Sequence, residues 1–214
     1  VAPPQSIPGD LLLAAVGRRP ATDGLNLEAA GITTDERGFI EVDDTLAASA
    51  EGIWAVGDCK GGPAFTHISY DDYRVLRDLW FSESTSTPRT GTAGRPVPYT
   101  VFTDPQLGRI GLSEKQALSE GIPFEVYSIP FSWIARALES GESAGLMKVI
   151  ASPDDGRLLG AAILGMEGGE LATMISLAMA GGLTVSDLRD GIFPHPGLAE
   201  AFNNLFSYGK RNSE

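Results

Sequence analysis

A histidine near the C-terminal end of the chain has neighbours that suit acid–base chemistry. His195 lies between Pro194 and Pro196, five residues before Glu200. An imidazole titrates near neutral pH, so it can accept and return a proton, and a carboxylate on one ring nitrogen fixes its tautomer and favours its charged form. The two prolines limit the backbone freedom of the loop. The alternative is a histidine in a helix-entry turn, with Glu200 as a solvated helix residue.

A Gly-Asp pair is the second place where chemistry is expected. Gly57 and Asp58 end the apolar segment GIWAVGD (52–58), which is typical of a buried strand. Ligands of open α/β sheets bind at the carboxyl edge of the strands, where an aspartate can accept hydrogen bonds from sugar-like hydroxyls. A helix that begins at Thr66 would present N–H groups to a ligand atom that becomes negative, with His67 in its first turn. The alternatives are a plain strand with an Asp turn, and a histidine that is only a polar residue near a helix start.

Composition limits the classes of function. The 214 residues carry a net charge of −12, which disfavours nucleic acid and anionic membranes as partners because their phosphates would be repelled. No apolar run approaches the roughly 20 residues of a membrane-spanning helix, and the first ten residues do not resemble a signal peptide, so we expect a cytoplasmic protein. Cys59 is the single cysteine, which excludes an internal disulfide, and two histidines are too few and badly spaced to predict a metal site.

The first half of the chain contains the elements that would position the Gly-Asp pair. Apolar runs and alternation predict strands at 10–17, 38–44 and 52–58, and helical spacing predicts a helix over 66–81. The segment that follows is rich in Ser, Thr, Gly and Pro and has no hydrophobic periodicity. We therefore expect an exposed linker at 82–97.

The second half has a different pattern, in which strands precede helices without strict alternation. Strands are expected at 98–104, 107–112, 124–130, 145–152 and 157–165, and helices at 113–121, 168–182, 184–190 and 197–207. The turn sequence SPDDG (152–156) predicts an antiparallel hairpin from the last two strands. This order predicts an α+β fold, an antiparallel sheet with helices, preceded by a partial α/β segment.

Two of the expected helices carry informative side chains. Ser113 and Gln116 fit a capping box at the start of the 113–121 helix. The 168–182 helix should place four apolar residues on one face, and a face rich in Met, Leu and Ala suits a symmetric dimer; these residues are Leu171, Met174, Ile175 and Ala178.

Several motifs resemble those of the pyridine nucleotide-disulfide oxidoreductases and follow each other in the same order as in that family, which includes dihydrolipoamide dehydrogenase, glutathione reductase and mercuric reductase. The motifs are VGRRP (16–20), IWAVGD (53–58), PYTVFTDPQLGRIGLSEKQA (98–117) and the stretch from GAAILG to NNLF (160–206). FTHISYDDY (65–73) and NNLF look most like mercuric-reductase-like members. The resemblance covers nearly the whole chain outside the linker.

The resemblance implies a division into domains. Residues 1–20 would be the end of the nicotinamide domain and the crossover, 21–81 the C-terminal segment of the FAD-binding domain, 82–97 the linker, and 98–214 the dimerisation domain. FAD and NAD(P)H would be the cofactors of the complete enzyme. Its partners would be a second copy of the same chain and the N-terminal FAD/NAD(P) half of the same enzyme.

The resemblance also implies roles for individual residues. Asp58 would bind the flavin ribitol beside Gly57, and the loop and helix start after it would contact the flavin edge through backbone N–H groups. His195 and Glu200 would form an acid–base pair that reaches the redox disulfide of the other subunit. The residues expected to bind the cofactor are thus Gly57, Asp58, Ala64, Phe65, Thr66 and His67.

The departures from the family pattern restrict what this chain can do. It has no pair of cysteines separated by four residues and no GxGxxG fingerprint, so we expect no reductase turnover from these 214 residues alone. The tail SYGKRNSE lacks the vicinal cysteines of mercuric reductases, and Phe193 and Gly197 stand where the family often has His and Thr. The sequence resembles the C-terminal half of a flavoprotein disulfide reductase, and the alternative is a stand-alone dimerisation or interaction module without redox activity.

Overall fold

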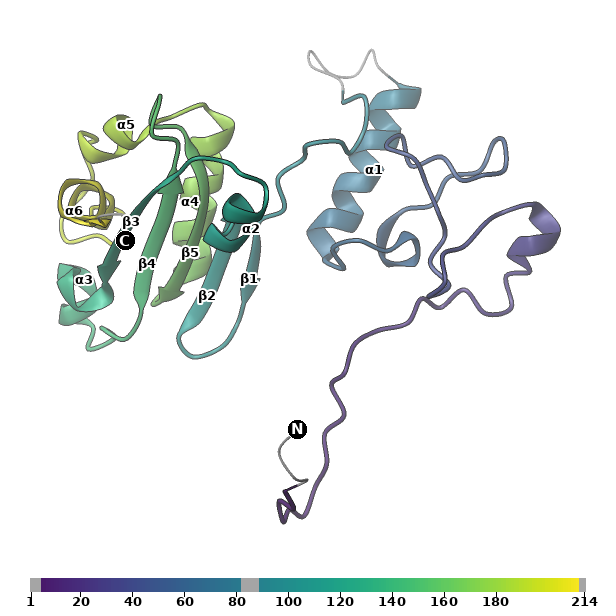
Figure 1. Cartoon of the computed structure of the whole chain (residues 1–214), viewed down its shortest axis with the longest axis horizontal. Coiled ribbons are helices and arrows are strands. Elements are labelled where there is room, and N and C mark those ends of the chain that lie inside the picture. Colours follow the sequence, from purple (N-terminus) through teal and green to yellow (C-terminus); the bar gives the residue numbers. More distant parts are fainter. Residues whose placement is uncertain (1–4, 82–88, 212–214) are drawn as a thin grey trace. The chain divides into compact units, whose positions relative to one another are not determined.

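The chain forms two compact units, Val1–Ala93 (unit 1) and Gly94–Glu214 (unit 2). The computed structural model describes residues 5–81 and 89–211 (Figure 1). Each unit has its own cluster of buried apolar side chains, and the cluster of unit 2 is much the larger of the two.

Unit 2 is built on a six-stranded antiparallel sheet in the order β1-β2-β5-β4-β3-β6. The strands are β1 Tyr99–Val101, β2 Gln106–Gly111, β3 Glu125–Pro130, β4 Leu146–Ala151, β5 Leu158–Gly165 and β6 Lys210–Arg211. Buried residues alternate with partly exposed ones along β2 and β3, as expected for a sheet with one face on the core. The sheet confirms the expected α+β class.

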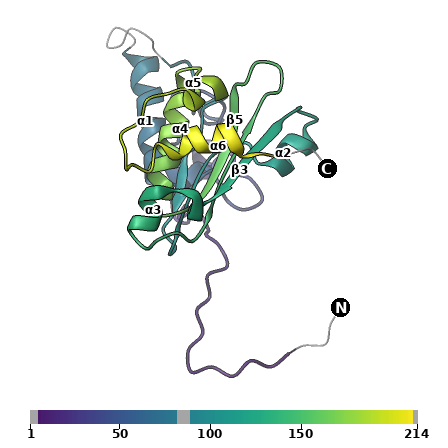
Figure 2. The ribbon, with the colours of Figure 1, turned by 90° about the vertical axis from the view of Figure 1, so that its left-hand side faces the viewer.

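The helices of unit 2 are α2 Glu114–Ser119, α3 Ala135–Glu139, α4 Gly168–Ala180, α5 Val185–Arg189 and α6 Ala201–Tyr208, with a 3₁₀ turn η4 at Phe131–Trp133. Helix α4 packs on β2 and β5, whereas α6 packs on β3 and on α5 (Figure 2). Glycine lets α4 approach the sheet closely, because a Cβ on Gly108 would overlap the carbonyl oxygen of Gly168 and the side chain of Ala172.

Most of the expected elements of unit 2 are present. The β4–β5 hairpin is confirmed, with Ser152 N–H donating to Arg157 O at 2.8 Å across the turn. The capping box of α2 is confirmed, since the Ser113 hydroxyl accepts from Gln116 N–H and the Gln116 side chain accepts from Ser113 N–H.

Unit 2 differs from the expectations in two details, and one helical segment was missed. Met174 is 44% exposed, whereas Leu171 and Ile175 of the same expected face are buried. Helix α6 begins at Ala201 and not at Gly197, because the helical pattern is preceded by a bend at residue 198 and a turn at 199–200. The helical segment after β3 was not expected, although Phe131, Ile134 and Ala137 are fully buried at helical spacing.

In its described residues, 5–81 and 89–93, unit 1 contains one long helix, α1 Thr66–Trp80, and two 3₁₀ turns, η1 Leu27–Ala30 and η2 Gly57–Lys60. The expected helix over 66–81 is thus confirmed. Its apolar side chains Val75 and Leu76 pack with Leu46 in a small core, and Val42 and Leu79 lie against it.

The three strands expected in unit 1 are wrong. Within residues 5–81 the only β-pairings are isolated bridges, Thr34 with Ile40, Val42 with Ala48, and Ala47 with Trp54. The apolar run at 10–17 is extended and exposed, and its residue Leu11, for example, is 98% exposed. A strand needs a neighbour for its backbone N–H and C=O groups, and no described residue pairs with this run. The linker expected at 82–97 lies partly outside the described residues.

Candidate functional site: a histidine–glutamate pair and a helix start

The side chains of His195 and Glu200 are in direct contact. His195 Nδ1 lies 2.8 Å from Glu200 Oε2 and 3.1 Å from Oε1. An ionised carboxylate can only accept hydrogen bonds, so this contact favours a proton on Nδ1, and in the neutral imidazole Nε2 then keeps its lone pair. The imidazole is 70% exposed while the carboxylate is only 19% exposed. The pair therefore presents an accessible proton acceptor whose far side is fixed by a half-buried anion.

Helix α6 and the turn before it hold the glutamate. Glu200 is the N-cap of α6, so it precedes the helix. The helix expected over 197–207 would have placed it about one turn inside. The helix itself is fixed by the core, because Phe202 and Leu205 are at most 1% exposed. A carboxylate near the start of a helix is favoured by the partial positive charge there.

The two departures noted around His195 have structural explanations. Phe193 packs edge-on against Phe202 with ring centroids 6.0 Å apart, so this position contributes apolar packing and not a second imidazole. Gly197 fits because a Cβ there would lie 2.6 Å from Pro194 O, which is closer than the loop allows.

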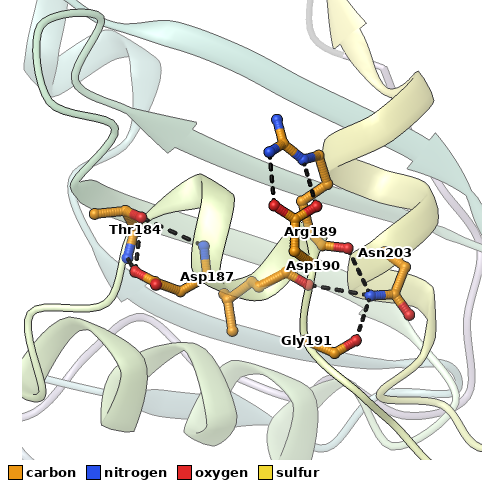
Figure 3. A network of polar contacts seen from close by, with 7 residues as sticks. Thr184, Asp187, Arg189, Asp190, Gly191 and Asn203 are labelled. Carbon is orange, nitrogen blue, oxygen red and sulfur yellow. Dashed lines mark hydrogen bonds and ion pairs between the residues drawn. The ribbon is translucent and has the colours of Figure 1, made fainter.

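Polar contacts secure the chain before the histidine (Figure 3). Thr184 and Asp187 form a capping box at the start of α5, and the Thr184 hydroxyl, followed by its backbone N–H, lowers the pKa of the Asp187 carboxyl. The Arg189 guanidinium donates to Asp190 through Nε at 2.8 Å and Nη2 at 2.7 Å, which lowers the pKa of the Asp190 carboxyl. Both carboxylates therefore stay ionised well into acid pH.

Asn203 was missed by the sequence analysis. Its side-chain amide donates to the backbone carbonyls of Arg189 at 2.8 Å, Gly191 at 2.9 Å and Leu188 at 3.3 Å. The available signal was an asparagine inside a predicted helix, where this residue is a poor helix former unless its side chain has another use.

The residues expected to bind a cofactor lie in unit 1, in η2, in the loop after it and in the first turn of α1. Asp58 is in η2 and its carboxylate is 53% exposed, accepting from Arg18 Nη1 at 3.3 Å. Helix α1 begins at Thr66, and its N-cap Phe65 has no side-chain group that caps the first turn. Ala64, Thr66 and His67 are exposed, and the His67 ring stacks on Phe65 with centroids 5.2 Å apart.

A buried ion pair fixes this turn to the helix. The Asp72 side chain is fully buried, and its Oδ2 accepts from Gly57 N–H at 2.8 Å and lies 3.3 Å from Lys60 Nζ. Gly57 has φ +73°, and a Cβ there would lie 2.9 Å from Ser69 Oγ. Glycine at this position thus permits both the left-handed backbone and the close approach to α1.

Other kinds of site find little support. The Cys59 thiol donates to Val56 O at 3.3 Å. Among residues 5–81 and 89–211, no group of three or more His, Cys, Asp or Glu side chains could hold a metal ion. In the part of the chain that the structure describes, no helix is long and apolar enough to cross a membrane.

Comparisons with known proteins agree with this geometry. Residues 97–206 match the family model of the pyridine nucleotide-disulphide oxidoreductase dimerisation domain, and residues 3–72 match that of pyridine nucleotide-disulphide oxidoreductase. The probable pyridine nucleotide-disulfide oxidoreductase RclA of Escherichia coli is 42% identical over 94% of this chain and 45% of its own length. A dihydrolipoyl dehydrogenase of Thermus scotoductus is 38% identical over 89% of this chain and 40% of its own length.

A solved structure shares the fold as well as the sequence. The structure of the HOCl-induced flavoprotein disulfide reductase RclA from Escherichia coli superposes with a TM-score of 0.83 at 42% identity, over 91% of this chain and 44% of that one. This chain thus spans less than half the length of these relatives. The chain belongs to the pyridine nucleotide-disulphide oxidoreductase family, and residues 97–206 are its dimerisation domain.

Proposed function

We propose that this chain is the C-terminal part of an FAD-dependent NAD(P)H:disulfide or thiol oxidoreductase. In that enzyme it supplies part of the flavin site, the dimer interface, and an acid–base pair for the active site of the partner subunit. The observation that carries the proposal is the contact of 2.8 Å between His195 Nδ1 and Glu200 Oε2, beside an imidazole that stays 70% exposed.

The pair has the properties of a proton acceptor for a thiol. His195 Nε2 takes the proton of a thiol S–H, leaving a thiolate that can attack a disulfide. Glu200 stabilises the imidazolium that forms and keeps the ring in the tautomer that has Nε2 free. In the reverse direction the imidazolium returns the proton to the leaving thiolate. The exposure of the ring is what a group serving another polypeptide needs.

The turn and helix start in unit 1 fit part of a flavin. The half-exposed Asp58 carboxylate can accept hydrogen bonds from the ribitol hydroxyls once Arg18 moves aside, and Gly57 leaves the backbone accessible. The start of α1, whose N-cap Phe65 makes no side-chain cap hydrogen bond, can hold the flavin edge where reduction places negative charge. When bound, FAD passes electrons between the nicotinamide and the disulfide. Ala64, Phe65, Thr66 and His67 lie where their backbone can contact it.

Helix α4 and the loop after it provide the surface for a homodimer. Leu177 is 70% exposed, Met174 is 44% exposed and Leu183 is 42% exposed. Exposed apolar side chains on a helix that packs on the sheet suit a self-complementary interface. This surface, and not the buried face of α4, is where the second copy binds.

The exposed run at 10–17 favours this proposal over a stand-alone dimerisation module. Leu11, Leu12, Leu13 and Val16 are 87–98% exposed. An apolar run of this kind suits burial against further protein, which we identify as the N-terminal FAD/NAD(P) half. The redox cysteines and dinucleotide fingerprints would also come from that half, so the 214 residues alone are inactive.

Half-reactions of the complete reductase test the proposal. In a His195→Gln variant, reduction of the flavin by NAD(P)H should keep its rate, whereas electron transfer between the cysteines and the thiol or disulfide substrate should slow by about 10²–10⁴-fold, the usual effect of a positioned acid–base group. Glu200→Gln should slow the same half-reaction less. If each half-reaction runs at the same rate in His195→Gln as in wild type, the acid–base role is overturned. A complete gene product that binds no flavin would favour the stand-alone module.

A further inference from the structure

The segment 191–195 is fixed to one helix at every second residue. Gly191 contacts Asn203 through its carbonyl, Phe193 packs on Phe202, and His195 contacts Glu200. The intervening residue Ile192 is fully exposed, and Pro194 is exposed as well. The segment therefore runs beside the start of α6 in the opposite direction, with alternate residues facing that helix.

Asn203 makes the contact farthest from the histidine. All three neighbours of its side-chain nitrogen are carbonyl oxygens, so the amide must present its NH₂ group and not its oxygen. The two hydrogens serve the short contacts to Arg189 O at 2.8 Å and Gly191 O at 2.9 Å, and Leu188 O at 3.3 Å shares one of them. Figure 3 shows the Asn203 amide at the end of α5, where the 191–195 segment begins.

The last carbonyls of a helix have no partner within the helix. Asn203 satisfies the carbonyls of Leu188 and Arg189, in the last turn of α5, and that of Gly191 two residues beyond Arg189. It thereby fixes the point at which the chain leaves α5 relative to α6. Because Glu200 is the N-cap of the same helix, both ends of the 191–195 segment contact α6 or its N-cap.

We propose that Asn203 is a positioning residue that keeps His195 within hydrogen-bond distance of Glu200. This rests on the proposed acid–base function of the pair. Asn203 touches neither the imidazole nor the carboxylate; it acts by fixing the backbone that carries the imidazole. Without its amide, the start of the segment is released, and the imidazole leaves the carboxylate for part of the time.

The ring tautomer of His195 tests this proposal directly in the full 214-residue chain. The chain has two histidines, so long-range ¹H–¹⁵N spectra at alkaline pH, where imidazole is neutral, report His195, with His67 of unit 1 as an internal reference. Wild type should show Nδ1 protonated at His195. Asn203→Ala and Asn203→Asp should show a mixture with Nε2 protonated, and the His67 signals should not change.

The neighbouring asparagine provides a matched control. Asn204 is also on α6 and is partly exposed like Asn203, but it takes no part in these contacts. Asn204→Ala and Asn204→Asp make the same chemical changes and should leave the His195 spectrum as in wild type. In both Asn203 variants the amide hydrogen of Asp190, which is donated to Ser186 O at 3.0 Å, should exchange about tenfold faster, and amides of β4 and β5 should exchange at wild-type rates.

Each outcome decides the proposal. An unchanged His195 tautomer in both Asn203 variants overturns it, and so does an equal change in the Asn204 variants. Loss of the β4 and β5 amide signals in both Asn203 variants overturns it too, since Asn203 would then maintain the fold and not the loop. In the complete reductase, Asn203→Ala should slow the thiol or disulfide half-reaction and leave flavin reduction unchanged. A shifted tautomer together with a fully active His195→Gln variant would contradict the proposed function while the positioning role stands.

Discussion

Replacing Lys60 by Met is expected to destabilise unit 1 and with it the turn that carries Asp58. The Lys60 side chain is 8% exposed and the Asp72 side chain is fully buried, with Nζ and Oδ2 3.3 Å apart. The same Oδ2 accepts from Gly57 N–H at 2.8 Å. Removal of the ammonium takes an ion-pair partner from a buried carboxylate, while the methionine can still fill most of the space.

The size of the effect follows from this geometry. At 3.3 Å the attraction is about 5 kcal/mol with an effective dielectric constant of about 20. Removing one partner of a buried pair destabilises proteins by about 3–5 kcal/mol. The apolar cluster described in unit 1 is small, with Leu46, Val75 and Leu76 buried and two flanking residues packed against them, and whole domains are stable by only about 5–15 kcal/mol. The variant should therefore lose most of the stability of unit 1.

Urea unfolding followed by tryptophan fluorescence can measure this loss. Trp54 and Trp80 of unit 1 are packed edge-to-face with ring centroids 5.0 Å apart, and the third tryptophan, Trp133, belongs to unit 2, so Trp133→Phe is the background of choice. The double variant Lys60→Met/Asp72→Asn removes both charges and should recover most of the stability. A loss below about 1 kcal/mol in Lys60→Met, or a double variant less stable than Lys60→Met, would refute the reasoning.

Three further predictions concern other parts of the chain. Burial of the phenol, followed by its hydrogen bond to Glu125, raises the pKa of Tyr127 to about 12. A neutral phenol is therefore favoured in the folded state. The stability that it contributes to unit 2 should be complete below about pH 10, and roughly 2–3 kcal/mol should be lost as the pH rises toward 12. Urea unfolding of Tyr127→Phe should lack this part of the alkaline loss, and a loss equal to that of wild type would contradict the prediction. Gly57→Ala should destabilise unit 1 by about 1–2 kcal/mol because of the left-handed backbone. Adding Ser69→Ala to this variant should recover only the part of the lost stability that is due to the contact with the hydroxyl. A Gly57→Ala variant that unfolds at the wild-type temperature would refute this. Leu177→Glu should weaken self-association at least about tenfold by sedimentation equilibrium, since the twofold brings two added carboxylates together; an unchanged dissociation constant would place the interface elsewhere.

Sequence reasoning succeeded where the determining contacts are local. The turn at 152–156, the capping box of α2 and the five-residue spacing of His195 and Glu200 bring together residues that are close in the chain. The helix starting at Thr66 was also predicted from its own periodicity. The α+β class of unit 2 follows from such local elements in sequence order.

Sequence reasoning failed where the partner is distant or missing. The run at 10–17 has the composition of a strand, but pairing depends on neighbours that none of the described residues supplies. Met174 was expected on one helix face with Leu171 and Ile175, but periodicity alone cannot show which part of an apolar face is buried and which is exposed. Asn203 reaches carbonyls 12 to 15 positions earlier in the chain, a contact that only the packing of α5 against α6 creates.

Hybrid dimers of the complete reductase test most directly whether His195 serves the partner subunit. One copy carries His195→Gln, and the other has its redox cysteines replaced by serine, so that neither homodimer turns over. If the imidazole acts across the dimer, each hybrid has one intact site, and an equal mixture refolded together should regain about a quarter of the wild-type rate, because half of the dimers are hybrids and each has one of two sites. A mixture no more active than either homodimer would contradict the account.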